Sequence, residues 1–205
     1  PRSTPKPSSA ASDVYKRHNT DSLVKISPYK FNCKGGQGKS NHVEVVPIPD
    51  LFRGEFNNPK MAGKQYAKAV QEAINKQGEG STFIAESMLG CGGQIPLPND
   101  FLAESYKCIR ASSGVCISDE VQVGLGRMGS AFWAFETHEV IPDIVTIGKP
   151  LGNGHPIAAV VTTAEIASFF NNGMEYFNSF GGNPVSCAIG LSVLNVIEQE
   201  GLQEN

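Results

Sequence analysis

Short apolar runs that end in a polar or charged residue recur along this chain. Residues 82–85, 115–118 and 144–147 are mostly apolar, and the first two lead directly into Glu86 and Asp119. Each run has the length of a strand, and stretches with helical spacing of apolar residues lie among them. Near-continuous apolar strands that alternate with helices are typical of a parallel or mixed sheet covered on both faces. The sequence therefore predicts an α/β fold.

Amphipathic helices are expected around these strands. Helical spacing of apolar residues predicts them from Tyr66 to Gly78, from Asp100 to about Ser113 and from about Val185 to Glu200. A further apolar run, residues 157–161, predicts one more strand. Asp100 has a side chain that commonly caps the first turn of a helix, and we expect it to do so here.

Composition limits the classes of function. The chain has 205 residues, 40% hydrophobic and 18% charged, which is enough for one buried core. Its net charge of -3 provides no basic surface for nucleic acid or an anionic membrane. No apolar run approaches the roughly 20 residues that span a bilayer. We therefore expect a soluble protein whose partner is a small molecule.

The cysteines indicate a reducing compartment. Five cysteines are scattered without a CxxC pair or zinc-ligand spacing, and an odd number does not suit a disulfide framework. The first residues lack the apolar segment of a signal peptide. We expect no metal site, and a location inside the cell, either mitochondrial or cytoplasmic.

Ligands of open α/β sheets bind at the carboxyl ends of the strands. Asp119 and Lys149 stand at two such ends, and alone they would indicate no more than a surface ion pair. Their neighbours are more informative. Residues 119–122 read Asp-Glu-Val-Gln, residues 124–129 are glycine-rich, and residues 148–154 place Lys149 between glycines.

These segments, together with Asn-Ser-Phe-Gly-Gly-Asn-Pro at residues 178–184, resemble the signature of class III aminotransferases, which are fold type I pyridoxal-phosphate enzymes. The resemblance runs from about Ile26 to Gln203. It implies pyridoxal 5'-phosphate as the cofactor, an amine as the substrate, and an α/β large domain with a mostly parallel sheet covered by helices.

The resemblance implies that this domain is incomplete. Residues 1–13, rich in Ser, Pro and Ala, are expected to form a flexible arm. Residues 14–205 are expected to form a cofactor-binding large domain without the upstream segment that cradles the phosphate and without the small C-terminal domain. The chain also lacks an initiating Met, so we interpret it as a fragment.

Two catalytic residues follow from the resemblance. Lys149 would bind the cofactor as a Schiff base and later move the proton at Cα of the substrate. Asp119 would pair with the pyridinium nitrogen and keep it protonated. Glu120 would point to the opposite side of an extended segment, so we expect no catalytic role for it.

Further cofactor contacts are implied for four residues. Val121 would pack on the ring face, and Gln122 would reach the phenolic oxygen. Ser179 would reach the cofactor phosphate of a neighbouring subunit, which implies a homodimer with shared active sites. Tyr15 would stack over the ring, although the two residues after it differ from those usual in the family.

The reaction is left open between two types. The chain resembles the branch of phospho-lyases that act on ethanolamine phosphate or phosphohydroxylysine, and Cys91 stands where many ω-aminotransferases carry a gating glutamate. We therefore favour a phospho-lyase. The alternative is an aminotransferase that passes the amino group to glyoxylate or pyruvate.

Two further hypotheses belong to other classes. Residues 124–129 fit the G-x-G-x-x-G dinucleotide pattern, but Asp143 stands at the beginning of its strand and not at the end, where that fold requires an acid. The chain could also be an inactive or purely dimerising fragment, because the segments named above are missing from it.

Overall fold

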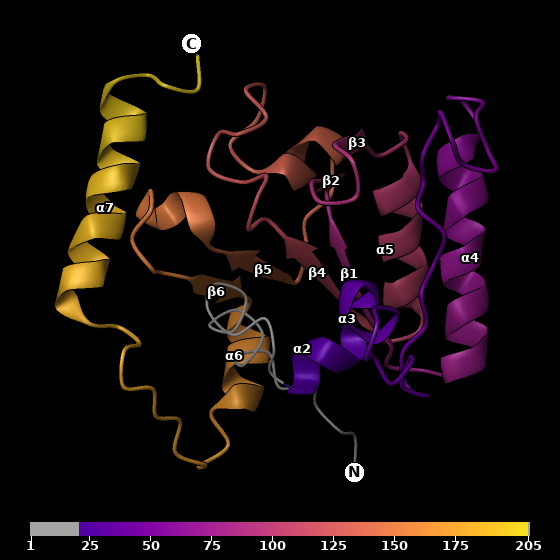
Figure 1. Ribbon diagram of the computed structural model, residues 1–205, viewed down its shortest axis with the longest axis horizontal. Coiled ribbons are helices and arrows are strands. Elements are labelled where there is room, and N and C mark those ends of the chain that lie inside the picture. Colours follow the sequence, from indigo (N-terminus) through magenta and orange to yellow (C-terminus); the bar gives the residue numbers. More distant parts are fainter. Residues whose placement is uncertain (1–20, 205) are drawn as a thin grey trace.

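The computed structural model describes residues 21–204, which form an α/β architecture around a four-stranded sheet (Figure 1). The strands are β1 (Thr82–Glu86), β4 (Val115–Asp119), β5 (Ile144–Ile147) and β6 (Ala159–Thr162). They lie in the order β1-β4-β5-β6. β1, β4 and β5 are parallel, and β6 pairs with β5 in the antiparallel direction. The expected mostly parallel sheet is confirmed.

Two helices, α4 (Ala62–Gln77) and α5 (Phe101–Ala111), lie side by side next to β1 (Figure 1). α4 buries Tyr66, Val70 and Ile74, the stripe that the sequence predicted. α5 packs on β1 and β4, because the Phe83 ring meets the ring of Phe101 edge-on at 6.4 Å between centroids. These contacts form the larger hydrophobic core.

The second helix begins as expected but is not capped as expected. Asp100 occupies the N-cap position of α5, yet its backbone has a φ of 67° and its side chain makes no capping hydrogen bond. The Asp100 carboxylate instead lies 3.7 Å from the Lys64 ammonium of α4. The prediction of a capping role was therefore wrong, because the left-handed backbone does not direct the side chain to the first turn.

Shorter elements complete the fold. They are α2 (Asp21–Ile26), α3 (Pro28–Phe31), the hairpin β2 (Met88–Leu89) and β3 (Ile95–Pro96), the 3-10 helices η1 (Ala134–His138) and η2 (Lys149–Gly152), α6 (Ala164–Phe170) and α7 (Pro184–Gln199). α7 packs on η2, on the far side of the molecule from α4 (Figure 1). Within residues 21–204, no helix is both long and apolar enough to span a membrane.

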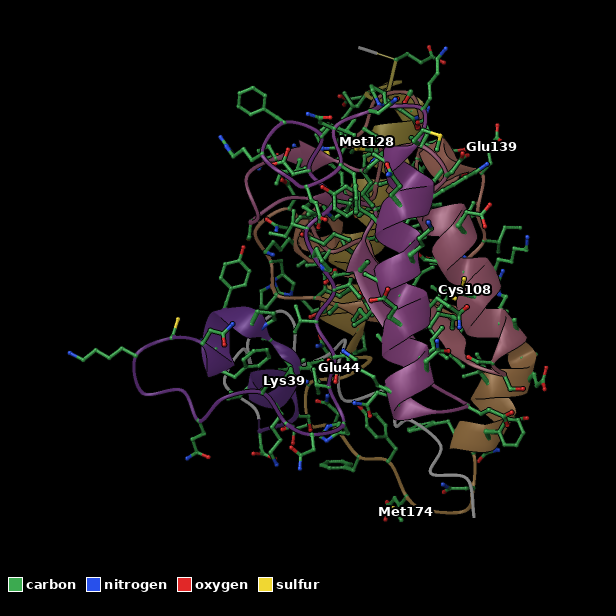
Figure 2. All side chains as sticks on the ribbon, turned by 90° about the vertical axis from the view of Figure 1, so that its right-hand side faces the viewer. Lys39, Glu44, Cys108, Met128, Glu139 and Met174 are labelled. Atoms are coloured by element: carbon green, nitrogen blue, oxygen red, sulfur yellow. The ribbon has the colours of Figure 1, made fainter. Side chains whose placement is uncertain are left out.

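The segment ahead of α4 is held against the end of that helix. Figure 2 shows Lys39 and Glu44 close together in this segment, and their charged groups lie 3.2 Å apart. The Gln77 amide at the end of α4 donates to the Asn41 carbonyl at 2.9 Å and to the Glu44 carboxylate at 3.3 Å. These bonds fix the approach of the chain to the core helices.

The two faces of the sheet are buried to different extents. Phe83, Cys116 and Ser118 lie on the face that α5 covers, and all three are buried. The neighbouring residues Ile84 and Ile117 point to the opposite face, as alternation along a strand requires. Ile84 there keeps 44% of its surface exposed. The helical cover is therefore denser on the α5 face.

Replacing Phe83 with Ala should lower the free energy of unfolding by about 3 to 5 kcal/mol, because a large buried ring is lost from between α5 and the sheet. Chemical denaturation of the purified chain measures this change. Phe52→Ala is the control, since Phe52 is 87% exposed and the loss should stay below about 1 kcal/mol. Equal losses for the two variants would contradict the core assignment.

Candidate active site at the carboxyl ends of the strands

Three polar side chains stand in one row where the parallel strands end. Glu86 of β1 is in register with Asp119 of β4, and Asp119 is in register with Thr146 of β5. The Thr146 hydroxyl lies 3.4 Å from Asp119 Oδ1, to which it donates. Lys149 follows three residues after Thr146, at the start of η2. The sheet thus gathers two carboxylates, a hydroxyl and a lysine at one edge.

Asp119 is a carboxylate held with little access to water. Both hydrogen bonds that it accepts from described residues reach Oδ1, from Thr146 and, at 3.1 Å, from the Val121 backbone N–H. Burial raises the pKa of Asp119, while the Val121 N–H and the nearby Lys149 ammonium act to lower it. Asp119 and Lys149 therefore share one site, as the sequence predicted.

The backbone around Lys149 is unusual. Lys149 has a φ of 21°, a positive value that residues with a Cβ rarely adopt. Gly148 precedes it, and a Cβ at Gly148 would lie 3.3 Å from Cγ1 of the buried Val121. The absence of a side chain at Gly148 thus lets Val121 pack directly beside the lysine turn. Strained backbone of this kind is common at functional sites.

Gln122 reaches across to β1 and to the loop between β2 and β3. Its Nε2 donates to Glu86 Oε1 at 3.2 Å and to Cys91 Sγ at 3.1 Å. The other carboxylate oxygen, Glu86 Oε2, accepts from the Gly90 backbone N–H at 3.0 Å. Burial raises the pKa of Glu86, and the neighbouring Asp119 adds to this effect.

Glu120 lies on the other side of the strand and is completely buried. Its carboxylate accepts from the Ser118 hydroxyl at 2.9 Å and from the backbone N–H groups of Ala134 and Phe135 at 2.7 and 3.2 Å. Burial raises its pKa. The expected orientation away from Asp119 is confirmed, and Glu120 joins the end of β4 to the first turn of η1.

Two expected cofactor contacts remain predictions. Ser179 is exposed on the loop between α6 and α7, where it stands apart from the row at the strand ends (Figure 1). A contact with the cofactor of a neighbouring subunit would need a second copy of the chain. Tyr15 lies outside the described residues.

The glycine-rich segment does not form a dinucleotide site. Residues 124–129 form turns, and the next element is the short 3-10 helix η1 in place of the α-helix that a dinucleotide fold requires. Asp143, at the start of β5, accepts from the Arg110 guanidinium at 3.0 Å and from the Cys116 backbone N–H at 2.8 Å. It therefore has a structural role.

Sequence reasoning missed three residues of this site. Glu86 was recognised only as the end of a strand, Thr146 was treated as part of an apolar run, and Gly148 only as a flank of the lysine. The available signal was the period of two along parallel strands, which places side chains at equivalent strand ends next to one another. No metal-binding cluster of His, Cys, Asp or Glu occurs within residues 21–204.

The sheet and its polar edge define an α/β protein with a ligand site at the carboxyl ends of parallel strands, where a buried acid faces a lysine. The family model described as aminotransferase class-III matches residues 22–205. The chain belongs to the class III aminotransferase family. Its fold is that of part of the large domain of a fold type I pyridoxal-phosphate enzyme, as expected.

Individual relatives carry two kinds of name. The alanine-glyoxylate aminotransferase 2-like protein of Drosophila melanogaster is 52% identical, covering 89% of this chain and 39% of that protein. The mitochondrial alanine-glyoxylate aminotransferase 2 of Homo sapiens is 41% identical over the same shares of the two chains. A phospholyase from Arthrobacter, solved in complex with phosphoethanolamine, is 37% identical with a TM-score of 0.81, covering 91% of this chain and 44% of that one. The chain thus spans about two fifths of these relatives.

Asp119→Asn should make the chain more stable at neutral pH. Because the folded-state pKa of Asp119 is raised above 3.8, the free energy of unfolding of the unaltered chain falls as pH rises from about 3.8 towards the raised value. Asn cannot ionise, yet its Oδ1 can still accept from the Val121 N–H. Urea denaturation across this pH range should show an advantage of the variant that grows with pH.

The control for the lost charge is Asp21→Asn, on the short helix α2, where the side chain is 79% exposed. A stability difference between Asp119→Asn and the unaltered chain that stays the same at every pH would contradict the desolvation of Asp119.

Proposed function

We propose that this chain provides the cofactor-binding part of a pyridoxal-phosphate enzyme that eliminates phosphate from a small phosphorylated amine, ethanolamine phosphate or phosphohydroxylysine. The observation that carries the proposal is the pairing of buried Asp119 with Lys149 at neighbouring strand ends, in a member of the class III aminotransferase family.

The residues of the site fit pyridoxal phosphate. Asp119 is a desolvated carboxylate whose raised pKa reflects the need for a cationic partner, which a protonated pyridine nitrogen would supply. Val121 provides an apolar surface beside Gly148 for a planar ring. Lys149 is exposed and can reach an aldehyde carbon. When bound, the cofactor supplies an electron sink that makes the Cα–H bond of an amine substrate acidic.

The side chains then have distinct tasks. Lys149 holds the cofactor covalently and, once displaced by the substrate amine, removes the proton from Cα. Asp119 keeps the proton on the ring nitrogen through a charge-assisted hydrogen bond. If that bond strengthens by about 1.5 to 3 kcal/mol as charge develops, it contributes about 10- to 150-fold to the rate.

Elimination is favoured over amino transfer for two reasons. Cys91 stands where many ω-aminotransferases carry a gating glutamate, and its sulfur takes up the Gln122 amide at 3.1 Å. A site without this glutamate is not built to alternate between two amino donors. In addition, the Arthrobacter phospholyase with phosphoethanolamine superimposes over 91% of the chain.

Amino transfer to glyoxylate or pyruvate is the second candidate. The human relative at 41% identity is named an aminotransferase. Lys149 and Asp119 would serve both reactions, because each begins with removal of the Cα proton. The two differ only in the fate of the electrons, which leave with phosphate in one case and stay on the cofactor in the other.

Two features of the assembly belong to the same proposal. A homodimer would bring Ser179 of one subunit to the cofactor phosphate of the other, which accounts for its exposed position away from Lys149. The human relative is named mitochondrial, and we propose the same compartment for this protein.

Borohydride reduction of the chain loaded with pyridoxal phosphate should attach the pyridoxyl group at Lys149, because the reduced Schiff base cannot exchange. Peptide mass spectrometry locates the label. Lys107→Ala removes an exposed lysine of α5 and should leave the labelling unchanged. Labelling that persists at the same level in Lys149→Ala would overturn the assignment.

The reaction type is decided by the need for an acceptor. The chain, or a longer protein containing it, should release inorganic phosphate and ammonia from ethanolamine phosphate with no keto acid present, since elimination regenerates the bond to Lys149 within one turnover. Phosphohydroxylysine is the second substrate to assay. Ethanolamine without the phosphate is the matched control and should yield no ammonia. Strict dependence on glyoxylate or pyruvate, with no phosphate released from either phosphorylated amine, would establish amino transfer instead.

A further inference from the structure

We propose that Glu86 is a positioning residue: its carboxylate holds one hydrogen of the Gln122 amide and thereby aims the other hydrogen at an acceptor. Cys91 Sγ takes the place of that acceptor in this structure. The proposal concerns residues of β1 and the β2–β3 loop, to which the resemblance assigned no contact with the cofactor.

The carboxylate determines which end of the amide faces it. A glutamine amide has a donor end and an acceptor end of nearly equal size, so shape alone does not orient it. An ionised carboxylate only accepts, and Glu86 Oε1 lies 3.2 Å from Gln122 Nε2. Glu86 Oε2 is fixed in turn by the Gly90 backbone N–H at 3.0 Å. Each carboxylate oxygen therefore has one donor, and the NH2 end of Gln122 must point to β1.

Gly90 gives independent support, because it leaves the space that the amide occupies. A Cβ at Gly90 would lie 2.9 Å from Gln122 Nε2 and 3.4 Å from Glu86 Oε1. The nearest atom belongs to a flexible side chain, so an alanine here would displace the Gln122 amide and leave the backbone in place. The loop thus supplies both a donor for Glu86 and room for Gln122.

The consequence for the cofactor rests on the proposed function. A phenolic oxygen that carries negative charge needs a donor, and the second hydrogen on Nε2 can supply it when the oxygen replaces Cys91 Sγ. An amide turned the other way would present its carbonyl and repel that oxygen. Glu86 would then affect cofactor binding through Gln122, without touching the cofactor.

The orientation itself can be tested on the chain without cofactor. The side-chain NH2 resonances of Gln122, assigned with Gln122→Glu, report its hydrogen bonds by 1H–15N NMR. In Glu86→Gln, the carbonyl of the new residue keeps the bond to the Gly90 N–H, so its NH2 faces residue 122 and the Gln122 amide must turn over. Both Gln122 proton resonances should shift.

Two glycine variants make a matched pair. Gly90→Ala should shift the same Gln122 resonances. Gly92→Ala lies in the same loop, where the new Cβ would meet only the side chain of Leu89, at 3.3 Å, and it should leave them unchanged. Gln122 resonances that are identical in Glu86→Gln and in the unaltered chain would overturn the proposal.

A double-mutant cycle tests the consequence for binding. Glu86→Gln should weaken pyridoxal phosphate binding by about 3- to 10-fold, the range of one hydrogen bond. In the Gln122→Ala background the same change should cost less than about 2-fold. An equal loss in both backgrounds would show that Glu86 acts independently of Gln122 and would overturn the role. If the unaltered chain binds no pyridoxal phosphate at all, the proposed function fails, while the NMR result still decides the role of Glu86.

Discussion

The parallel register of β1, β4 and β5 is the constraint on which the site depends. It aligns Glu86, Asp119 and Thr146 at one edge of the sheet, although they are far apart in the sequence. Parallel strands end at the same side only when helical connections carry the chain back, and the hydrophobic contacts of α5 with β1 and β4 stabilise that return. Loss of this packing would separate the site residues even if each strand persisted.

The alternation of side chains along the strands gives the sheet edge two different faces. Asp119 points into the site, whereas its neighbours Ser118 and Glu120 point into the interior. There the Ser87 hydroxyl bonds to Ser118 at 3.0 Å and the Glu120 carboxylate receives three donors. A buried polar network is stabilising only when its members are satisfied, and it then specifies one arrangement. We infer that this network holds the backbone on which Asp119 is mounted.

The site retains charge at a cost to stability. Burial raises the pKa values of Asp119 and Glu86, so the folded chain holds two carboxylates in surroundings that favour their neutral forms. Lys149 opposes this effect at both groups. Local violations of stability rules are expected where a site is built for a ligand. The positive φ of Lys149 is a second violation at the same edge.

The sequence by itself determined the strands, the main helices and the positions of Asp119 and Lys149, because periodicity and strand-end position are local properties. It did not predict that Asp100 would leave its helix uncapped, since a left-handed backbone depends on the packing around it. Nor did it predict the bond from Gln122 to Glu86, which joins residues 36 positions apart. Only the tertiary structure decides such contacts, because strand order and register bring together side chains that no spacing along the chain relates.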